Sequence, residues 1–447
     1  LSPHRRLILA ECQTRPLSAA VWSERYKTAG VWSPVVDLNQ NEERAKVEQS
    51  LVDLARRVSS YSHQITGIAG ERGNLAPESR GSFGELQRQV QQKLASIEKY
   101  SIKNDESQDR IWRMFEAASM EQPLVQFHIG NNDILTFVHW QKETILRRFP
   151  DGRPKLAKLL RKWRFILEEE LLQRHLGHKN SVDTENKLFD ELGDWLWKPL
   201  EISDHHKRIL VLPEGELANI PWQALRINGR PLAENHSFVM APSLRHYIHA
   251  REISVNSSEI RVFVGESDDL PQISMELDKL SKLSNKHVSI MNPANRNDWS
   301  QNDSAELWHY SGHAFLRSDN PFYSYLTLAD GPLFAADFRL KNSKVELVTL
   351  AACRSGEQVA LSGEEATGLV RSLLEMGARN VIAGHWPVSD ESTAMWMTEF
   401  YSGYFDNETL SDAAVRASFK VREKYPSAYH WAAFSVFGAG GRSNAYN

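Results

Sequence analysis

The sequence predicts an α/β protein with a mostly parallel sheet flanked by helices, preceded by an all-α N-terminal arm. From residue 208 onward, short apolar runs alternate with segments of helical spacing, which is typical of parallel strands joined by helices. The run at residues 346–352 shows no polar alternation, as expected for a strand covered on both faces. Before residue 123 the spacing is helical, so the sheet is expected to begin after the arm.

The N-terminal arm is expected to comprise residues 1–122. Two of its segments, 43–66 and 85–100, place apolar side chains at helical spacing and could form a helical hairpin. The stretch between them, 67–82, is rich in Gly, Pro and Ser and is expected to be a loop. The arm could be the end of a repeat array, although no repeat is visible within it.

The composition of the chain changes at Pro123. Residues 124–129 and 134–140 flank a turn-rich linker and predict a β-hairpin. Helices are expected at 154–175 and 186–200, with a polar linker between them. The first half of helix 154–175 is basic and could bind phosphate or nucleic acid, but charge runs on helices are usually solvated faces.

Strands and helices alternate after this region. The strands are expected at 209–212, 238–241, 260–264, 287–290, 307–311, 325–328, 347–352, 380–383 and 434–437. The helices are expected at 243–251, 273–283, 364–376, 389–404 and 409–423.

Composition limits the classes of function. The formal net charge of the 447 residues is −4, which gives no overall field favouring nucleic acid or an anionic membrane. No stretch approaches the roughly 18 consecutive apolar residues of a transmembrane helix, and the first residues do not resemble a signal peptide.

The only cysteines are Cys12 and Cys353, so a disulfide framework is not expected and a reducing, cytoplasmic location is favoured. Nothing in the sequence implies a cofactor.

Two of the apolar runs end in reactive side chains. The run 305–311 leads to His313, and the run 347–352 leads to Cys353. Ligands bind at the carboxyl ends of strands in open α/β sheets. If the two strands are neighbours, as expected, the pair suggests a thiol–imidazole dyad with His313 as base and Cys353 as nucleophile. The backbone N–H groups of Ala314 and Cys353 are candidates for an oxyanion hole. Alternatively, Cys353 is a small buried hydrophobe, as free cysteines often are.

A metal site is a further interpretation of the same region. His309, His313, Cys353 and His385 could converge, but no acidic or cysteine partner stands at a metal-ligand spacing. No metal is therefore expected, and His309 is expected to support the base or to lie in the core.

A series of motifs resembles the CHAT family of caspase-like cysteine peptidases, which is related to caspases and separase. The motifs are ILVLPEG at 209–215, IPWQAL at 220–225, WHYSGH at 308–313, LAACRSG at 350–356 and WPVSD at 386–390. They are specific in combination and extend the resemblance over residues 123–438. The resemblance implies a caspase-like fold with a degenerate half at 123–252 and an active CHAT half at 253–447.

The resemblance also implies peptide-bond hydrolysis by Cys353 and His313. It suggests Asp390 as the carboxylate that pairs a basic P1 side chain of the substrate. Alternatively, Asp390 merely opens the helix that follows it, since acidic residues favour a first turn. Ala314 stands where the family commonly has glycine and could crowd the oxyanion hole, so a catalytically silent scaffold for protein–protein interaction is the alternative function.

The resemblance implies a protein substrate, with gasdermin-like proteins or other effectors of bacterial, including antiviral, defence as candidates. The helical arm is expected to receive an activating protein or nucleoprotein and thereby to regulate the peptidase. No membrane partner is expected.

Overall fold

The computed structural model describes residues 8, 15–29, 108–176, 182–265, 273–300, 304–316, 324–338, 342–352 and 363–442. The chain divides into two units, one formed by Leu1–Ser23 with Asp109–Asn447 and the other by Glu24–Gln108. The helical hairpin expected at 43–66 and 85–100 lies outside the described residues. The described parts of the arm are helical, as expected, and form α2 (Pro16–Ala29) and α5 (Gln108–Glu121).

An eleven-stranded sheet lies at the centre of the first unit, in the order β3-β2-β1-β4-β7-β16-β15-β14-β10-β8-β9. Its strands are β1 (Leu124–Ile129), β2 (Ile134–Trp140), β3 (Glu143–Phe149), β4 (Arg208–Leu212), β7 (Ser237–Met240), β8 (Ile260–Val264), β9 (Val288–Met291), β10 (Ser304–Gly312), β14 (Lys344–Ala352), β15 (Asn380–Gly384) and β16 (Phe434–Gly438). The prediction of a mostly parallel sheet is confirmed.

The antiparallel strands β2 and β3 form one edge of the sheet, and its other nine strands form two parallel groups that run in opposite directions. One group is β1, β4, β7 and β16, and the other is β15, β14, β10, β8 and β9. They meet where β15 and β16 pair antiparallel. Each group therefore presents its carboxyl ends at its own edge of the sheet, and the candidate site belongs to the second group.

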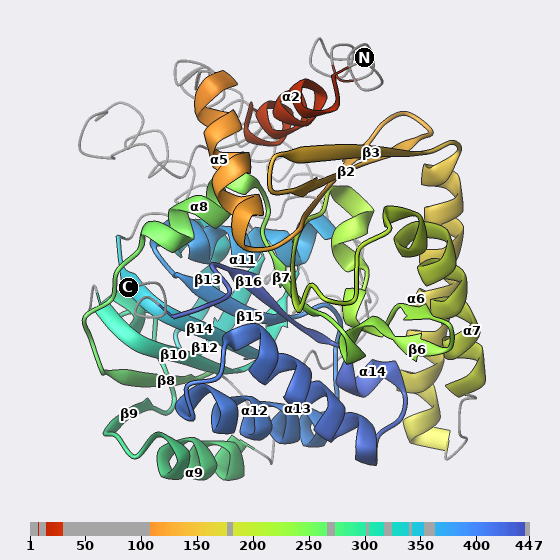
Figure 1. Cartoon of the computed structure of the whole chain (residues 1–447). Helices are drawn as coiled ribbons and strands as arrows, with labels where there is room; N and C mark the ends of the chain where they lie inside the picture. The colour runs from red at the N-terminus through yellow and green to blue at the C-terminus, as the bar shows by residue number, and fades with distance from the viewer. Residues whose placement is uncertain are drawn as a thin grey trace, which may run out of the picture. The chain divides into compact units, whose positions relative to one another are not determined.

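Helices cover both faces of this sheet (Figure 1). One layer contains α9 (Ile273–Ser284), α12 (Asp390–Phe405) and α13 (Leu410–Lys424), which pack against one another. The other layer contains α8 (Leu244–Glu252), α10 (Ala335–Phe338) and α11 (Gly363–Met376). A hairpin of α6 (Gly152–Leu176) and α7 (Val182–Leu192) forms one margin of the unit, and the short α14 (Ala428–Trp431) follows α13.

Successive side chains of β10 point alternately toward the two helical layers that cover the sheet. Trp308 and Tyr310 face an aromatic cluster in which Phe263 stacks on Trp299 with ring centroids 4.0 Å apart. His309 faces the other way, toward α9 and α12. This alternation is the period of two that a strand imposes, and it separates an apolar layer from a polar one beneath the candidate site.

Some elements differ from the sequence expectations. The strand expected at 325–328 exists as β12 (Tyr325–Leu328), but it belongs to a separate small sheet with β11 (Ala314–Phe315) and β13 (Gly331–Phe334). The edge strand β3 was not expected, because its charged and half-exposed side chains lack the apolar run of a buried strand. A two-residue pair, β5 (Arg226–Ile227) with β6 (Arg230–Pro231), was also not expected.

The helix expected at 186–200 is wrong in its limits. It begins at Val182 and ends at Leu192, where the backbone widens into a π-turn over Gly193–Trp197 and then a 3-10 turn over Lys198–Leu200. A Cβ atom on Gly193 would lie 2.0 Å from the carbonyl oxygen of Arg226, so the turn depends on a residue without a side chain. This close approach is a tertiary contact that helical periodicity does not reveal.

Candidate active site

The site is built where β10 and β14 end. These strands are parallel neighbours, as predicted, and their register places Gly312 beside Ala352. His313 follows Gly312, and Cys353 follows Ala352. Cys353 lies outside the described residues, so the register of the two strands is what relates its position to that of His313.

The backbone of His313 is held by several hydrogen bonds to its carbonyl oxygen. The Tyr310 hydroxyl donates to this oxygen at 2.8 Å, the backbone N–H of Thr327 at 3.0 Å and the Thr327 hydroxyl at 3.2 Å. Tyr310 is fully buried, and burial raises the pKa of its phenol, so the hydroxyl remains a donor. The backbone at His313 is thus held by β12 and by Tyr310 of β10.

Gly312 is required by this arrangement. Its φ of +156° is one that L side chains rarely adopt. A Cβ atom there would lie 2.7 Å from the Tyr310 hydroxyl oxygen, inside the contact distance of the two atoms. The glycine therefore lets the tyrosine reach past the end of β10 to the carbonyl of His313.

Ala314 opens β11 and pairs with Leu326 of β12. The neighbouring pair, His313 with Thr327, is a hydrogen-bonded one, because the Thr327 N–H donates to the His313 carbonyl oxygen. Hydrogen-bonded and non-hydrogen-bonded pairs alternate along an antiparallel ladder. The N–H of Ala314 is accordingly expected to point away from β12, and the alanine methyl does not alter that direction.

A buried polar cluster lies beneath the end of β10, toward α9 and α12. His309 Nδ1 lies 2.6 Å from the Tyr401 hydroxyl and 2.8 Å from the Thr349 hydroxyl. His309 Nε2 lies 3.4 Å from Glu276 Oε1, and the Ser311 hydroxyl donates to Glu276 Oε2 at 3.4 Å. His309 is thereby a fully buried residue of the core, which is one of the two alternatives expected from the sequence.

The groups of this cluster are neutral near pH 7. Burial lowers the pKa of His309 to about 3 and raises that of Glu276 to about 8, and the nearby charge of Asp390 adds to the second shift. The contact of His309 with Glu276 is therefore one between a neutral imidazole and a protonated carboxyl, and not an ion pair. Sequence reasoning missed Glu276 and Tyr401, because an acid and an aromatic in amphipathic helices carry no motif.

Asp390 lies at the start of α12, half-buried and close enough to Glu276 to raise its pKa. The N-cap of this helix is Ser389, whose hydroxyl accepts a hydrogen bond from the Ser392 N–H. Asp390 therefore lies in the first turn of α12, where the positive end of the helix dipole stabilises its carboxylate. This helix-opening role does not exclude a role in binding substrate.

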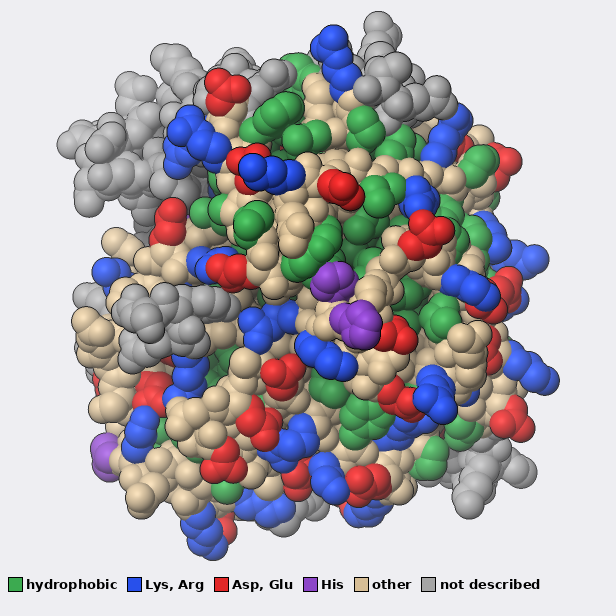
Figure 2. All heavy atoms as spheres, in the orientation of Figure 1, with side chains coloured by type: hydrophobic (Ala, Val, Ile, Leu, Met, Phe, Trp, Pro, Cys, Tyr) green, Lys and Arg blue, Asp and Glu red, His purple; other side chains and the backbone are tan. Residues whose placement is uncertain are grey.

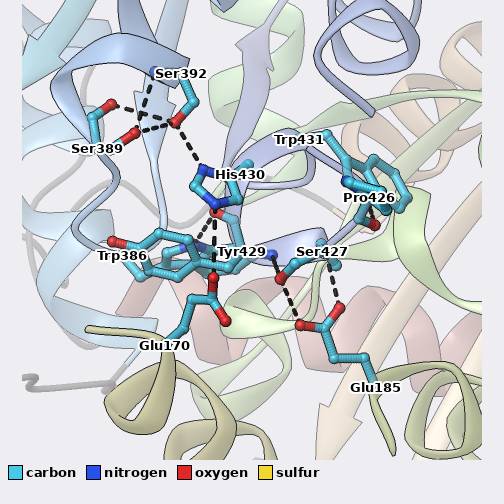
Figure 3. A network of polar contacts seen from close by, with 11 residues as sticks. Glu170, Glu185, Trp386, Ser389, Ser392, Pro426, Ser427, Tyr429, His430 and Trp431 are labelled. Carbon is cyan, nitrogen blue, oxygen red and sulfur yellow. Dashed lines mark hydrogen bonds and ion pairs between the residues drawn. The ribbon is translucent and has the colours of Figure 1, made fainter. Parts of the chain in front are cut away.

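A network of polar contacts connects the start of α12 with α6, α7 and α14 (Figure 3). The Ser392 hydroxyl lies 2.7 Å from that of Ser389 and 3.0 Å from His430 Nδ1, and His430 Nε2 faces Glu170 of α6 at 3.7 Å. Glu185 of α7 accepts hydrogen bonds from residues 427 and 428 at the start of α14. The α6–α7 hairpin thus supports the segment that carries Asp390.

Two of the residues considered for a metal, His309 and His385, have other partners. His385 Nε2 lies 2.7 Å from the Ser435 hydroxyl, and burial lowers the His385 pKa to about 4. His309 contacts Thr349 and Tyr401 instead. Within the described residues, no three His, Cys, Asp or Glu side chains lie together as metal ligands.

No helix in the described part of the chain is long and apolar enough to cross a membrane.

Solved structures share the architecture. A chain of the Saccharomyces cerevisiae separase–securin complex superposes with a TM-score of 0.51 at 10% identity, covering 97% of this chain and 43% of that one. The present chain thus spans less than half the length of that relative. The Arg-specific cysteine proteinase gingipain R matches with a TM-score of 0.36 at 10% identity, covering 59% of this chain and 68% of that one. Porphyromonas gingivalis RgpB, solved as a complex of its pro- and mature domains, gives a TM-score of 0.38 at 10% identity, with coverages of 58% and 69%. The separase match shows that the fold is of the caspase-like class.

The family follows from the sequence itself. The profile of the CHAT domain matches residues 186–439, which is more than half of the chain, and the protein therefore belongs to the CHAT family. No curated protein matches the chain as a whole.

Proposed function

We propose that the protein is a cysteine endopeptidase in which Cys353 is the nucleophile and His313 the general base. The observation that carries the proposal is the register of β10 and β14, which sets Gly312 beside Ala352 immediately before the two residues. The three hydrogen bonds to the His313 carbonyl support it, because a general base acts only when its position is fixed.

The proposed reaction proceeds through an acyl-enzyme. His313 accepts the proton of the Cys353 thiol, and the thiolate attacks the carbonyl carbon of the scissile peptide bond. The N–H groups of Ala314 and Cys353 donate to the oxyanion, for which the ladder geometry at Ala314 is favourable. His313 then protonates the leaving amine, and water attacks the thioester to release the second product.

Asp390 is proposed to pair a basic P1 side chain. Its half-buried carboxylate lies close enough to Glu276 to raise the pKa of that carboxyl, and a carboxylate in such a partly desolvated position can pair a cationic side chain. The substrate is proposed to be a protein, with gasdermin-like proteins or other defence effectors as candidates from the family resemblance.

Regulation by a protein partner is also part of the proposal. The separase relative was solved as a complex with securin, and the present chain carries a helical arm before its α/β unit. A partner bound to this arm is proposed to control when the peptidase acts, and a cytoplasmic setting would keep the catalytic thiol reduced.

The test is covalent labelling of Cys353 by a peptidyl acyloxymethyl ketone with Arg at P1. Cys12 reports ordinary thiol reactivity in the same molecule. We expect Cys353 to be labelled much faster than Cys12, His313→Ala to abolish the difference, and the exposed-histidine control His205→Ala to leave it unchanged. Asp390→Asn is expected to slow the Arg probe without slowing a probe with an uncharged P1 residue.

Equal labelling of Cys353 and Cys12, with and without candidate partners, would refute the peptidase. That result would instead support the silent scaffold suggested by Ala314. Fast labelling that persists in His313→Ala would show a reactive thiol with a different base.

A further inference from the structure

A groove lies between α6 and α7, on the hairpin that supports the start of α12. Its volume is about 600 Å³, in the range of pockets that hold ligands. From α6 it is lined by residues spaced as i, i+3, i+4 and i+7, namely Lys158, Arg161, Lys162 and Phe165. The same spacing recurs on the facing side of α7, so two helix faces form the walls of the groove; the α7 residues are Thr184, Lys187, Leu188 and Glu191.

The floor of the groove is apolar. Ile166 and Leu188 are buried at its base, while Phe165 stands in the wall with 59% of its surface exposed. A single exposed aromatic needs no explanation, but one that lines a concave, aliphatic-floored groove offers contact area to a ligand. The apolar part therefore suits a large apolar side chain.

The rim of the groove is cationic. Lys162 forms an ion pair with Glu191 at 3.0 Å, whereas Lys158, Arg161 and Lys187 form no ion pair with any other described residue. Figure 2 shows Lys and Arg side chains, among acidic ones, along the margin that α6 and α7 form in Figure 1. Like charges three residues apart on a helix repel each other, so Lys158 and Arg161 gain from a bound anion.

The cationic rim is short. The second half of α6 carries consecutive acidic residues at 168–170, and the net charge of the chain is −4. A long polyanion that followed α6 would therefore meet repulsion soon after leaving the groove, and phosphates would leave the aliphatic floor uncovered. The chemistry favours a short acidic segment that also carries an apolar side chain.

We propose that the α6–α7 groove is a docking site for an acidic, amphipathic peptide segment of a partner protein. The segment places a large apolar side chain against Phe165 and Leu188, and its carboxylates face Lys158, Arg161 and Lys187. This is the helix-in-groove mode of recognition with a charged rim. The site is separate from Cys353 and His313, so it stands whether or not the chain cleaves peptides.

The test is fluorescence anisotropy with the whole chain and a panel of fluorescein-labelled helical peptides. Each peptide has glutamates on one face and Leu, Phe or Trp on the other. Arg161→Glu on α6 and Lys187→Glu on α7 are each expected to weaken binding about tenfold or more, because each puts a like charge beside the ligand. Phe165→Ser is expected to weaken binding without changing its salt dependence.

Matched controls separate this site from general attraction. Lys142→Glu reverses an equally exposed charge in the turn between β2 and β3 and is expected to leave binding unchanged. A peptide with Gln in place of Glu is expected to bind at least tenfold more weakly. Urea unfolding of every variant checks that the exposed substitutions leave the fold intact.

Several results would overturn the proposal. The first is that no peptide of the panel binds, and the second is that Lys142→Glu weakens peptide binding as much as the groove variants do. The third is that Lys187→Glu leaves peptide binding unchanged, which would mean that α6 alone binds the peptides and the groove does not. Tighter binding of a single-stranded RNA oligonucleotide that competes with the peptides would assign the groove to nucleic acid instead. Peptide binding that is lost only in the groove variants would establish the groove as the peptide-docking site.

Discussion

Replacing Glu276 by glutamine is expected to make the protein less sensitive to rising pH. Burial, with the charge of Asp390, raises the pKa of this carboxyl from 4.5 to about 8. Between these values the folded state keeps the proton and the unfolded state releases it. The folded state thus binds more protons, so the free energy of unfolding of the natural protein falls as pH rises through this window.

The magnitude follows from the proton linkage. One group that is protonated in the folded state only contributes a slope of about 1.4 kcal/mol per pH unit. Glu276→Gln removes this slope but keeps an oxygen that can accept from Ser311 and an amide that can donate to His309 Nε2. The variant should therefore gain about 2.7 kcal/mol over the natural protein across two pH units inside the window.

The assay is urea unfolding of both proteins at several pH values, taking the difference in unfolding free energy at each. The difference isolates Glu276, because every other titrating group is common to both proteins. The control is Glu391→Gln at an exposed position of α12, where the hydrogen bond from Lys424 lowers the pKa of the carboxyl below 4.5, so that the group stays ionised throughout. A difference for Glu276→Gln that does not change with pH would refute the reasoning, since it would mean that the buried carboxyl is ionised in the folded state.

Other substitutions test the site and the packing of the sheet that carries it. Gly377→Ala should lower the unfolding free energy by about 3 kcal/mol or more, because φ is +118° and the new methyl would lie 1.8 Å from the Ser343 carbonyl oxygen; a loss below about 1 kcal/mol in urea unfolding would contradict this. Tyr310→Phe should cost about 1–2 kcal/mol and slow the labelling of the proposed nucleophile, because the carbonyl of His313 loses a donor; unchanged labelling would show that the other donors suffice. Ser389→Ala should cost about 1 kcal/mol by removing the N-cap of α12, and an unaltered urea midpoint would rule that out.

The sequence by itself determined the elements that local periodicity encodes. Runs rich in apolar residues identified the buried strands β10 and β14, and the residues that follow them identified His313 and Cys353 as a candidate pair. The neighbouring position of the two strands is confirmed by their register. Such predictions succeed because a strand buried on both faces needs apolar residues at most of its positions, a demand that is visible in one short segment.

Only the tertiary structure decided which distant side chains share a buried volume. Glu276 and Tyr401 reach His309 because α9 and α12 pack on one face of the sheet, and neither residue carries a local signal of that contact. The groove of α6 and α7 likewise appears when two ordinary helix faces meet. Burial changes the cost of a charge, so the protonation of Glu276 depends on surroundings that are assembled from far along the chain.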